Sequence, residues 1–364
     1  MSYWGSASKN RDTRAALTSR RQMEETMMEK TMTFTRRFLI ASGLIAAIAG
    51  GAQTVLAAES KQVAVMFDSL QSPFWVTGLE VLKEKLKAAG YEPVESISNL
   101  DDNKQFEQVQ SMIQKQVAGI IIVQTDSKAV IPAIREANKA GIPMVHFNRP
   151  PADSDAVSSA VQADNRAIMK ATIQALVDKA RKAGGKYKAA ILIGDLGDQN
   201  AIQRRDGFFD VVNANKDIIE VVSQISTEWN PDKAFADLTN ALQAHPDINF
   251  LVTSSDFLIP QIQQALKTAG KWKKTGEPGH VFFAGFDGDE GGYQALADGY
   301  MDVEGVQNLF FEADLAIDGL KKLKAGEKLP KLLLDPGFVL TQDTLAQDRT
   351  KSWGYAVWKK KNGG

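Results

Sequence analysis

Polar side chains follow several apolar runs of this chain at the point where each run ends. Carboxylates, amides, hydroxyls and a guanidinium group occur at these positions, in both halves of the chain. Gathered at one edge of a sheet, such groups can form a bidentate hydrogen-bonding cage around a polar ligand. The residues are, in chain order, Asp68, Gln124, Asp126, Asn148-Arg149, Asp195, Ser254-Ser255-Asp256 and Asp287.

A structural role competes with binding at some of these positions. Asp and Ser side chains often cap the helix that follows a strand, and we favour this interpretation for Asp126, Asp195 and Asp256. Asn148-Arg149 needs another explanation, because two prolines follow and no helix begins there.

The apolar runs are rich in Val, Ile and Phe, which is typical of parallel strands buried on both faces. Amphipathic segments separate them. In the first, Ser72-Pro73 predicts a helix start, a stripe of Trp75, Leu79, Leu82 and Leu86 predicts a buried face, and Gly90 predicts the end. Asp102 is predicted to cap the next helix. The predicted strands lie at 63–67, 119–123, 144–147, 189–193, 250–253 and 281–284.

The same unit occurs twice, which predicts two similar lobes. Residues 120–132 and 250–260 each pass from an apolar run through a polar turn to Ile-Pro, and each continues to Ala-Gly and another strand. Alternating strands and helices predict an α/β fold with two doubly wound, Rossmann-like lobes, and ligands of such sheets bind beyond the carboxyl ends of the strands. We expect one lobe at 59–163 plus about 308–342, the other at 164–307 plus about 343–364, and a multi-strand hinge between them.

Signatures of catalysis or metal binding are missing from the sequence. The three histidines, His146, His245 and His280, are widely spaced, and there is no Gly-x-Ser-x-Gly elbow or Walker loop. The chain has no cysteine, which excludes disulfides and thiolate metal sites. We therefore expect no enzyme activity, no cofactor and no metal.

An export signal is predicted at residues 1–58. Arg36-Arg37 precedes an uncharged stretch that ends in Val-Leu-Ala-Ala before Glu59, so we expect cleavage after Ala57 or Ala58 and a periplasmic location. The stretch is long enough for an uncleaved membrane anchor, but small polar residues dilute it. A twin-arginine pathway and an ordinary Sec pathway both remain open. Residues 1–31 are an extended basic region, or Met32 is the true start.

Composition fits a soluble two-domain protein without nucleic-acid partners. The chain is 44% hydrophobic and 24% charged, with a formal net charge of −1. Its 364 residues suffice for two cores, and nucleic-acid binding calls for a basic patch that this balance does not predict.

These motifs together resemble the type I periplasmic binding proteins, specifically the ribose-binding-protein-like sugar receptors of ABC importers. The resemblance runs from Lys61 to about Thr344. The motifs that carry it are residues 71–75 (Gln-Ser-Pro-Phe-Trp), 125–127 (Thr-Asp-Ser), 148–149 (Asn-Arg), 163–165 (Ala-Asp-Asn), 204–208 (Arg-Arg-Asp-Gly-Phe), 244–247 (Ala-His-Pro-Asp) and 285–288 (Gly-Phe-Asp-Gly).

The resemblance implies a set of ligand contacts, to which the polar strand ends add Gln124 and Ser255. Trp75 can instead belong to the apolar helix stripe, and Trp229, which precedes Asn230-Pro231, can instead be a hydrophobic staple. Ribose receptors have Asn where this chain has Ser255 and a small hydroxyl residue where it has Asp68, which weakens the case for ribose. The predicted contacts are Asp68, Ser72, Phe74, Trp75, Gln124, Asn148, Arg149, Arg204, Trp229, Ser255, Asp287 and Gln307.

The residue types of this set suit a neutral sugar or polyol. Guanidinium forks and carboxylates match hydroxyl groups, and aromatic faces match the C–H faces of a ring. Arg149 and Arg204 balance Asp68 and Asp287, so a neutral ligand fits better than a sugar phosphate or a sugar acid.

The expected function is therefore an extracytoplasmic solute receptor. It would be a monomer that closes by hinge motion and delivers its ligand to an ABC permease in the inner membrane. One alternative is an exported small-molecule sensor. Another is a repressor of the lac-repressor family, which would need a DNA-binding helix-turn-helix where residues 1–60 hold an export signal. An α/β hydrolase is disfavoured by the missing nucleophile motif.

Overall fold

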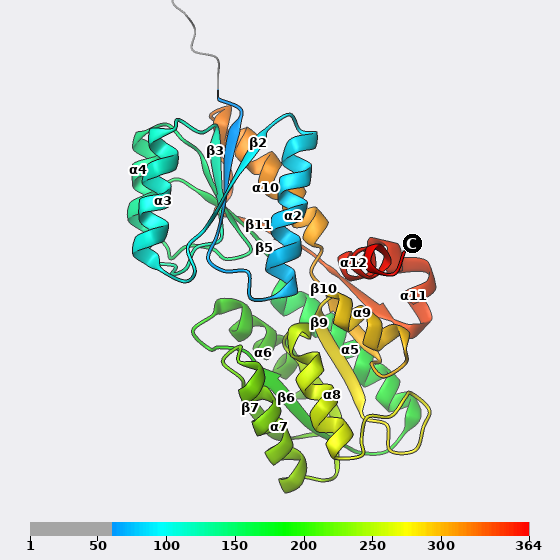
Figure 1. Cartoon of the computed structure of the whole chain (residues 1–364). Helices are drawn as coiled ribbons and strands as arrows, with labels where there is room; N and C mark the ends of the chain where they lie inside the picture. Colours follow the sequence, from blue (N-terminus) through cyan, green and yellow to red (C-terminus); the bar gives the residue numbers. More distant parts are fainter. Residues whose placement is uncertain (1–59, 364) are drawn as a thin grey trace, which may run out of the picture. The chain divides into compact units, whose positions relative to one another are not determined.

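The computed structural model describes residues 60–363, and the predicted export signal lies outside them. The chain forms two six-stranded sheets, which we call sheet A and sheet B (Figure 1). All neighbouring strands in the described residues are parallel except β10 and β12. The prediction of two doubly wound α/β lobes is confirmed.

Sheet A has the order β11-β5-β4-β3-β1-β2 and helices on both faces. Helices α3 and α4 cover one face, while α2 and α10 cover the other (Figure 1). The strands are β1 (Gln62–Phe67), β2 (Glu92–Ile97), β3 (Gly119–Ile122), β4 (Met144–Phe147), β5 (Ser159–Ala163) and β11 (Leu332–Asp335); the helices are α2 (Pro73–Ala88), α3 (Asp102–Gln114), α4 (Ile131–Lys139) and α10 (Leu309–Lys324).

Sheet B has the order β12-β10-β9-β8-β6-β7. Helices α5 and α6 pack on one face, and α7, α8 and α9 pack on the other. The strands are β6 (Tyr187–Ile193), β7 (Ile219–Ser226), β8 (Ile248–Thr253), β9 (Phe282–Asp287), β10 (Val303–Val306) and β12 (Phe338–Thr341); the helices are α5 (Asn165–Ala183), α6 (Gln199–Val212), α7 (Pro231–Ala244), α8 (Ile259–Thr268), α9 (Glu290–Ala297), α11 (Gln342–Asp348) and α12 (Trp353–Lys361).

Local sequence explains how α2 begins and ends. The Ser72 hydroxyl accepts the Trp75 amide at 3.4 Å, and Gly90 adopts a positive φ of 83° just after the helix. Leu79, Leu82 and Leu86 are buried as predicted. For α3 the predicted cap was wrong by one residue: Asp101 is the N-cap, because its carboxylate reaches the Lys104 amide three residues later.

The chain changes sheet three times, after β5, after β10 and after β11. We expected the last crossing near residue 342, but β11 pairs with β5 whereas β12 pairs with β10, so the crossing lies between Asp335 and Phe338. Asp335 joins the three crossings. Its carbonyl accepts the Asp164 amide at 2.8 Å, and its carboxylate accepts the amides of Asn308 at 2.6 Å and Gly337 at 2.9 Å.

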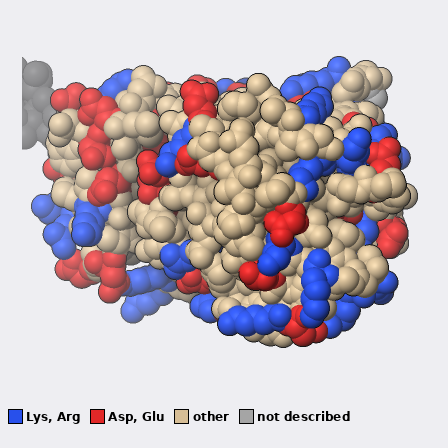
Figure 2. Space-filling model, turned by 90° about the horizontal axis from the view of Figure 1, so that it is seen from below, with Lys and Arg blue, Asp and Glu red and all other residues tan. Residues whose placement is uncertain are grey.

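Two other features bear on function. In the part of the chain that the structure describes, no helix is long and apolar enough to cross a membrane. Basic and acidic side chains are interspersed on the face seen in Figure 2, so this face shows no continuous basic surface of the kind that binds nucleic acid.

Candidate functional site

An ion pair lies at the carboxyl end of sheet A. Arg149, after β4, donates from Nη1 to Oδ2 of Asp68, after β1, at 2.7 Å. The Asp68 side chain is buried, and burial raises its pKa although the Arg149 guanidinium opposes the rise. The guanidinium carbon lies 4.9 Å from the centre of the Trp75 ring, and Arg149 Nε is buried with no hydrogen-bond partner among the described residues. Arg149 therefore keeps donor capacity beyond its carboxylate.

Gln124 positions the backbone beneath this ion pair. Its Nε2 donates to the Arg149 carbonyl at 2.7 Å, and its Oε1 lies 3.0 Å from Nδ1 of His146. Burial lowers the pKa of His146 to about 3, so the ring is neutral. Because Gln124 offers an acceptor to the ring, Nδ1 carries the proton.

The aromatic pair of α2 lies beside the same ion pair. Phe74 is buried and meets Trp75 edge-on, with ring centres 5.0 Å apart. Trp75 in turn meets Phe67 at 6.0 Å. Trp75 thus packs on the core through Phe67 and Phe74 and also contacts the guanidinium of Arg149, which combines a core role with a role at the candidate site.

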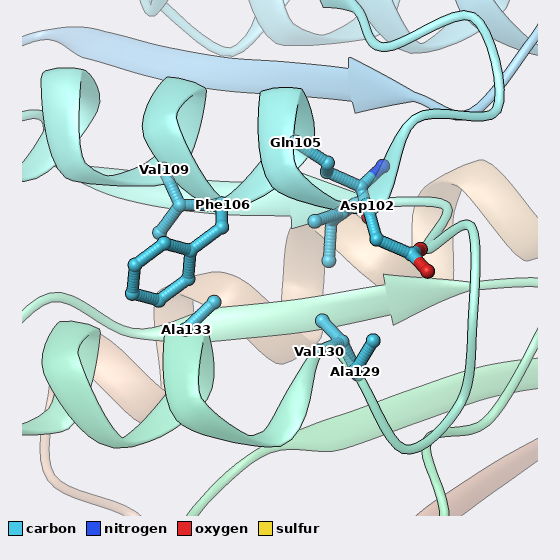
Figure 3. A pocket seen from close by; sticks show the side chains of 8 residues that line it. Asp102, Gln105, Phe106, Val109, Ala129, Val130 and Ala133 are labelled. Atoms are coloured by element: carbon cyan, nitrogen blue, oxygen red, sulfur yellow. The ribbon is translucent and has the colours of Figure 1, made fainter.

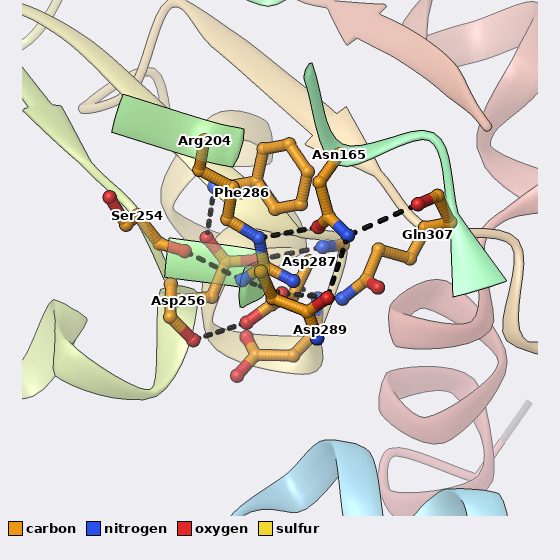
Figure 4. A network of polar contacts seen from close by, with 12 residues as sticks. Asn165, Arg204, Ser254, Asp256, Phe286, Asp287, Asp289 and Gln307 are labelled. Carbon is orange, nitrogen blue, oxygen red and sulfur yellow. Dashed lines mark hydrogen bonds and ion pairs between the residues drawn. The ribbon is translucent and has the colours of Figure 1, made fainter. Parts of the chain in front are cut away.

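A second ion pair lies at the carboxyl end of sheet B (Figure 4). Arg204 on α6 donates to Asp287 Oδ1 at 2.9 Å, to the Ser254 carbonyl at 2.8 Å and to Asn165 Oδ1 at 2.7 Å. Its guanidinium lies 4.2 Å from the centre of the Phe286 ring. The arginine is almost completely buried, so these partners replace the water that a surface arginine would have.

Asp287 receives hydrogen bonds from several elements. The Ser255 hydroxyl donates to Oδ2, and Gln307 Nε2 donates to Oδ1 at 2.7 Å. Burial raises the pKa of Asp287, and Arg204 opposes this rise. Its φ of 119° is rarely adopted by a residue with a side chain. The strand therefore ends in a strained conformation that its neighbours must hold.

Asn148 links the two ion-pair groups. Its Nδ2 donates to Gln307 Oε1 at 3.1 Å and to Glu312 Oε2 at 3.2 Å, while its Oδ1 accepts from Asn200 Nδ2 at 3.0 Å. Asn148 follows sheet A and Asn200 lies on α6 beside sheet B, so the contact joins the lobes. Both hydrogen-bonding groups of the Asn148 side chain are thus already used by the protein.

Two predicted contacts lie outside these clusters. Ser72 acts as the α2 cap described above. Trp229 packs against Phe257 and donates from Nε1 to Asp198 Oδ2 at 3.2 Å, and its ring lies so close to Gly194 that a Cβ there would be 2.1 Å away. Asn230 caps the following helix, as its position after Trp229 predicts.

The capping roles expected for three aspartates have different outcomes. Asp126 accepts amides of the turn before α4, and Asp195 accepts the Gly197 amide, which are local contacts. The prediction was wrong for Asp256. Its carboxylate accepts the amides of Phe286, Gly288 and Asp289, because it lies beneath the loop after β9. Asp256 therefore supports the strand end that presents Asp287.

Several functional neighbours were missed by the sequence reasoning. Asn200 and Glu312 face the crossings from helices, where no strand-end pattern marks them. Asn165 belongs to the 163–165 motif, which does not itself predict a contact, and its side-chain oxygen orients Arg204. Burial and the nearby Asp335 raise the pKa of Glu312 to about 8, so its carboxyl carries a proton at neutral pH.

The arrangement is suited to binding a ligand through hydrogen bonds and aromatic contact. Among residues 60–363, no group of three His, Cys, Asp or Glu side chains could hold a metal ion. A pocket between α3 and α4 is lined by Asp102, Phe106 and Val130 (Figure 3), but its volume of about 10 Å³ is that of a single water. The paired ions at the ends of the two sheets are thus the stronger candidate.

The chain is similar in sequence and in structure to known binding proteins. Residues 63–328 match the family model described as periplasmic binding protein domain. The chain is 30% identical over 257 residues to the ribose import binding protein of Salmonella typhimurium, covering 70% of this chain and 82% of that protein. It is 29% identical over 301 residues to the xylitol-binding protein of Mycolicibacterium smegmatis, covering 82% of each. A Mycobacterium smegmatis ABC transporter solute-binding protein, solved with bound glycerol, is 27% identical with a TM-score of 0.69, covering 79% of this chain and 96% of that one.

Proposed function

The chain belongs to the periplasmic binding proteins, of the ribose-binding type found in ABC importers, and we propose that it is an exported receptor for a neutral monosaccharide or polyol. One observation carries the choice of ligand: an arginine–carboxylate pair lies at the carboxyl end of each sheet, Arg149 with Asp68 and Arg204 with Asp287. The ligand would bind between the lobes and contact both pairs.

The pairing of charges argues for a neutral ligand. A sugar phosphate or sugar acid would bring negative charge to a site where each guanidinium already faces a carboxylate, and burying that charge without a partner is costly. A hydroxyl group, by contrast, can accept from an arginine and donate to a carboxylate without changing the charge balance. The site thus suits neutral hydroxyl-rich molecules.

The two pairs would play different parts. Arg149 is 28% exposed in its side chain and has an unpartnered Nε, so it can turn toward a ligand, and Trp75 beside it offers an aromatic surface. Arg204 is held by three partners and would present a fixed donor. Leaving one of these buried groups unpaired, as a sugar lacking one hydroxyl would, costs roughly 1–3 kcal/mol.

The remaining parts of the proposal follow from the family. The protein would be exported, with cleavage after Ala57 or Ala58, and would act as a monomer without catalysis. The three chain crossings would serve as the hinge, and the closed form would dock on a permease in the inner membrane.

A thermal-shift screen of the protein purified from the periplasm tests the function. The panel contains pentoses, hexoses, inositols and polyols, with ribose 5-phosphate as the charged comparison. A ligand at 100 times its Kd adds about 2.7 kcal/mol, which raises the melting temperature measurably. We expect a neutral compound to stabilise the protein and the phosphate to be silent.

Variants distinguish this site from others. Arg149→Ala and Asp287→Ala should abolish the shift, while Arg135→Ala should keep it, because Arg135, which lies on α4, forms an exposed pair with Asp155. A folded protein that no neutral compound stabilises would refute the proposed ligand class. A shift that survives in both site variants would refute the proposed site.

A further inference from the structure

The segment after the last strand contacts the Asp287 loop directly. This segment, 342–361, contains α11 and α12, and α12 packs beside α9 (Figure 1) through contacts of Tyr355 and Trp358 with Tyr293. At its start, Trp353 is 1% exposed and donates from Nε1 to the Asp287 carbonyl at 3.0 Å. The backbone of Asp287 thus has a partner from a distant part of the chain.

The next residue fixes this contact. The Gly354 amide donates to the Gly288 carbonyl at 3.1 Å. A Cβ at Gly354 would lie 2.3 Å from the carbonyl oxygen of Asp289, so no side chain fits between the two backbones. The backbone at the start of α12 therefore packs directly against the backbone of the loop 287–289.

Trp353 also reaches the other lobe. Its ring meets Phe74 edge-on, with centres 5.8 Å apart and planes at 79°. Phe74 lies on α2, which packs on sheet A and carries the aromatic pair beside Arg149. One indole consequently contacts an aromatic from the first lobe and the backbone of the carboxylate residue from the second.

The Asp287 backbone needs such support. Its positive φ is held on one side by Asp256, which accepts the amides of Gly288 and Asp289, and on the other by the Trp353 N–H at the carbonyl. If the indole N–H is removed, this carbonyl keeps only the longer hydrogen bond from the Gln307 amide, at 3.3 Å, and the strained residue loses one of the contacts that restrain its backbone.

We propose that Trp353 is a positioning residue of the ligand site, which sets the backbone of Asp287 and provides the surface against which Phe74 packs when the two lobes hold a ligand. This inference rests on the proposed function for its ligand. In this role the C-terminal segment 342–361 is a clasp that slows ligand release. Its removal would change affinity even though the segment supplies no charged ligand contact.

A matched pair of variants tests the clasp. Trp353→Phe keeps an aromatic ring but removes the N–H, and Trp358→Phe makes the same change on the same helix, at a ring that packs against Tyr293 and Tyr355. The probe is the neutral sugar or polyol that most stabilises the wild-type protein. We expect Trp353→Phe to raise Kd about 10-fold, the effect of one lost hydrogen bond at a buried carbonyl. The change should lie mainly in the dissociation rate measured by stopped-flow, with Trp358→Phe within twofold of wild type.

Gly354→Ala reaches the same contact without changing the indole. It should also increase the dissociation rate, because the added methyl separates α12 from the loop. A purely structural role predicts instead that both tryptophan variants lower the melting temperature and leave the dissociation rate unchanged. That result would overturn the proposal.

Hydrogen exchange separates this proposal from the proposed function. The amides of Gly288 and Asp289 should exchange faster in Trp353→Phe than in Trp358→Phe, with no ligand present. If wild type binds no neutral compound, the ligand class fails, and equal exchange in the two variants would then overturn the clasp as well. Faster exchange confined to Trp353→Phe would support the positioning contact.

Discussion

Replacing Arg204 by methionine should expose the cost of burying Asp287 without its counter-ion. Methionine preserves much of the side-chain volume beside Phe286 but removes three hydrogen bonds, including that to Asp287 Oδ1. Removing one partner of a buried pair typically costs about 3–5 kcal/mol. Asp287 would keep the Ser255 hydroxyl and Gln307, so we expect the lower end, about 3 kcal/mol at pH 8.

The pH dependence identifies the cause. Burial already raises the pKa of Asp287, and without Arg204, which opposes that rise, the pKa climbs further. A carboxyl whose folded pKa is raised destabilises the folded state above its unfolded pKa and ceases to do so as the pH falls toward that value. The cost of Arg204→Met should therefore be smaller at pH 5 than at pH 8, because a protonated carboxyl needs no counter-ion and protonation becomes easier as the pH falls.

Urea unfolding at pH 8 and at pH 5 measures the loss of unfolding free energy in Arg204→Met at each pH. Arg205→Met is the matched control, because Arg205 lies on the same helix and pairs with its partly exposed neighbour Asp206. The Arg205→Met substitution should leave the unfolding free energy nearly unchanged at both pH values. The double variant with Asp287→Asn should show a coupling of about 2 kcal/mol. A loss at Arg204 that is below 1 kcal/mol, or equal at the two pH values, would refute the ion-pair explanation.

Three further predictions concern groups away from the ion pairs. Burial lowers the pKa of His280, but the hydrogen bond that His280 donates to the Asp302 carboxylate outweighs this and raises the pKa. Burial raises the pKa of Asp302, but its contacts with His280 and Lys179 hold that pKa below its usual range. The stability contributed by His280 is present at low pH and is lost as the pH rises through the raised pKa of the histidine. The stability contributed by Asp302 is lost as the pH falls below the unfolded pKa of the aspartate. Urea unfolding should therefore show the greatest loss of stability in His280→Gln between about pH 4 and 6.5. Asp335→Ala should cost about 2 kcal/mol of unfolding free energy near pH 7, since two partly buried amides at the crossings lose their acceptor. A loss under about 0.5 kcal/mol in urea unfolding would contradict that role. Burial raises the pKa of Glu312 to about 8, so the stability of Glu312→Gln relative to wild type should increase from pH 5 to pH 8 and level off above; a pH-independent difference would show that the carboxyl is ionised in the folded protein.

The sequence predicted the interior strands well and the outer strands poorly. The six apolar runs correspond to β1, β3, β4, β6, β8 and β9, which lie inside the sheets or beside their centres. The strands β2, β7, β11 and β12 were not predicted. They are the sheet edges, where most residues are only partly buried, and the apolar runs in β11 and β12 are short and separated only by Asp335-Pro336-Gly337. β5 and β10 are buried but short, with polar or glycine residues that interrupt the pattern.

The strand-end rule found Asp68, Arg149 and Asp287 because topology places these residues at the ends of the sheets, whereas Arg204, which lies on α6, was predicted from the family resemblance. Asp68 and Arg149 are far apart in sequence, yet β1 and β4 both flank β3 in one parallel sheet. The rule could not separate a carboxylate that pairs with an arginine from one that supports the backbone. Asp256 has the same position in the pattern as Asp68 but accepts amides of the neighbouring loop. Nor could it find Trp353, whose contact with Asp287 depends on how a helix outside both sheets packs.

The two ends of the site differ in rigidity, and this difference bears on how a ligand is held. Gly288 has φ +80° and its Cβ position would lie 2.6 Å from Val306, so the loop after β9 has no room to move toward β10. The Asp256 carboxylate accepts a hydrogen bond from the Gly288 amide, and the Trp353 indole donates one to the Asp287 carbonyl. A group fixed in this way loses little entropy when it binds, and so contributes more of its interaction energy to affinity. Arg149, with one partner for its guanidinium and an exposed surface, can instead adapt to the hydroxyl pattern presented. Affinity for the proposed ligand should therefore depend chiefly on the Asp287 end of the site. Discrimination among similar sugars should depend on the Arg149 end, because a mobile donor can adjust to the position of a hydroxyl group whereas a fixed donor cannot.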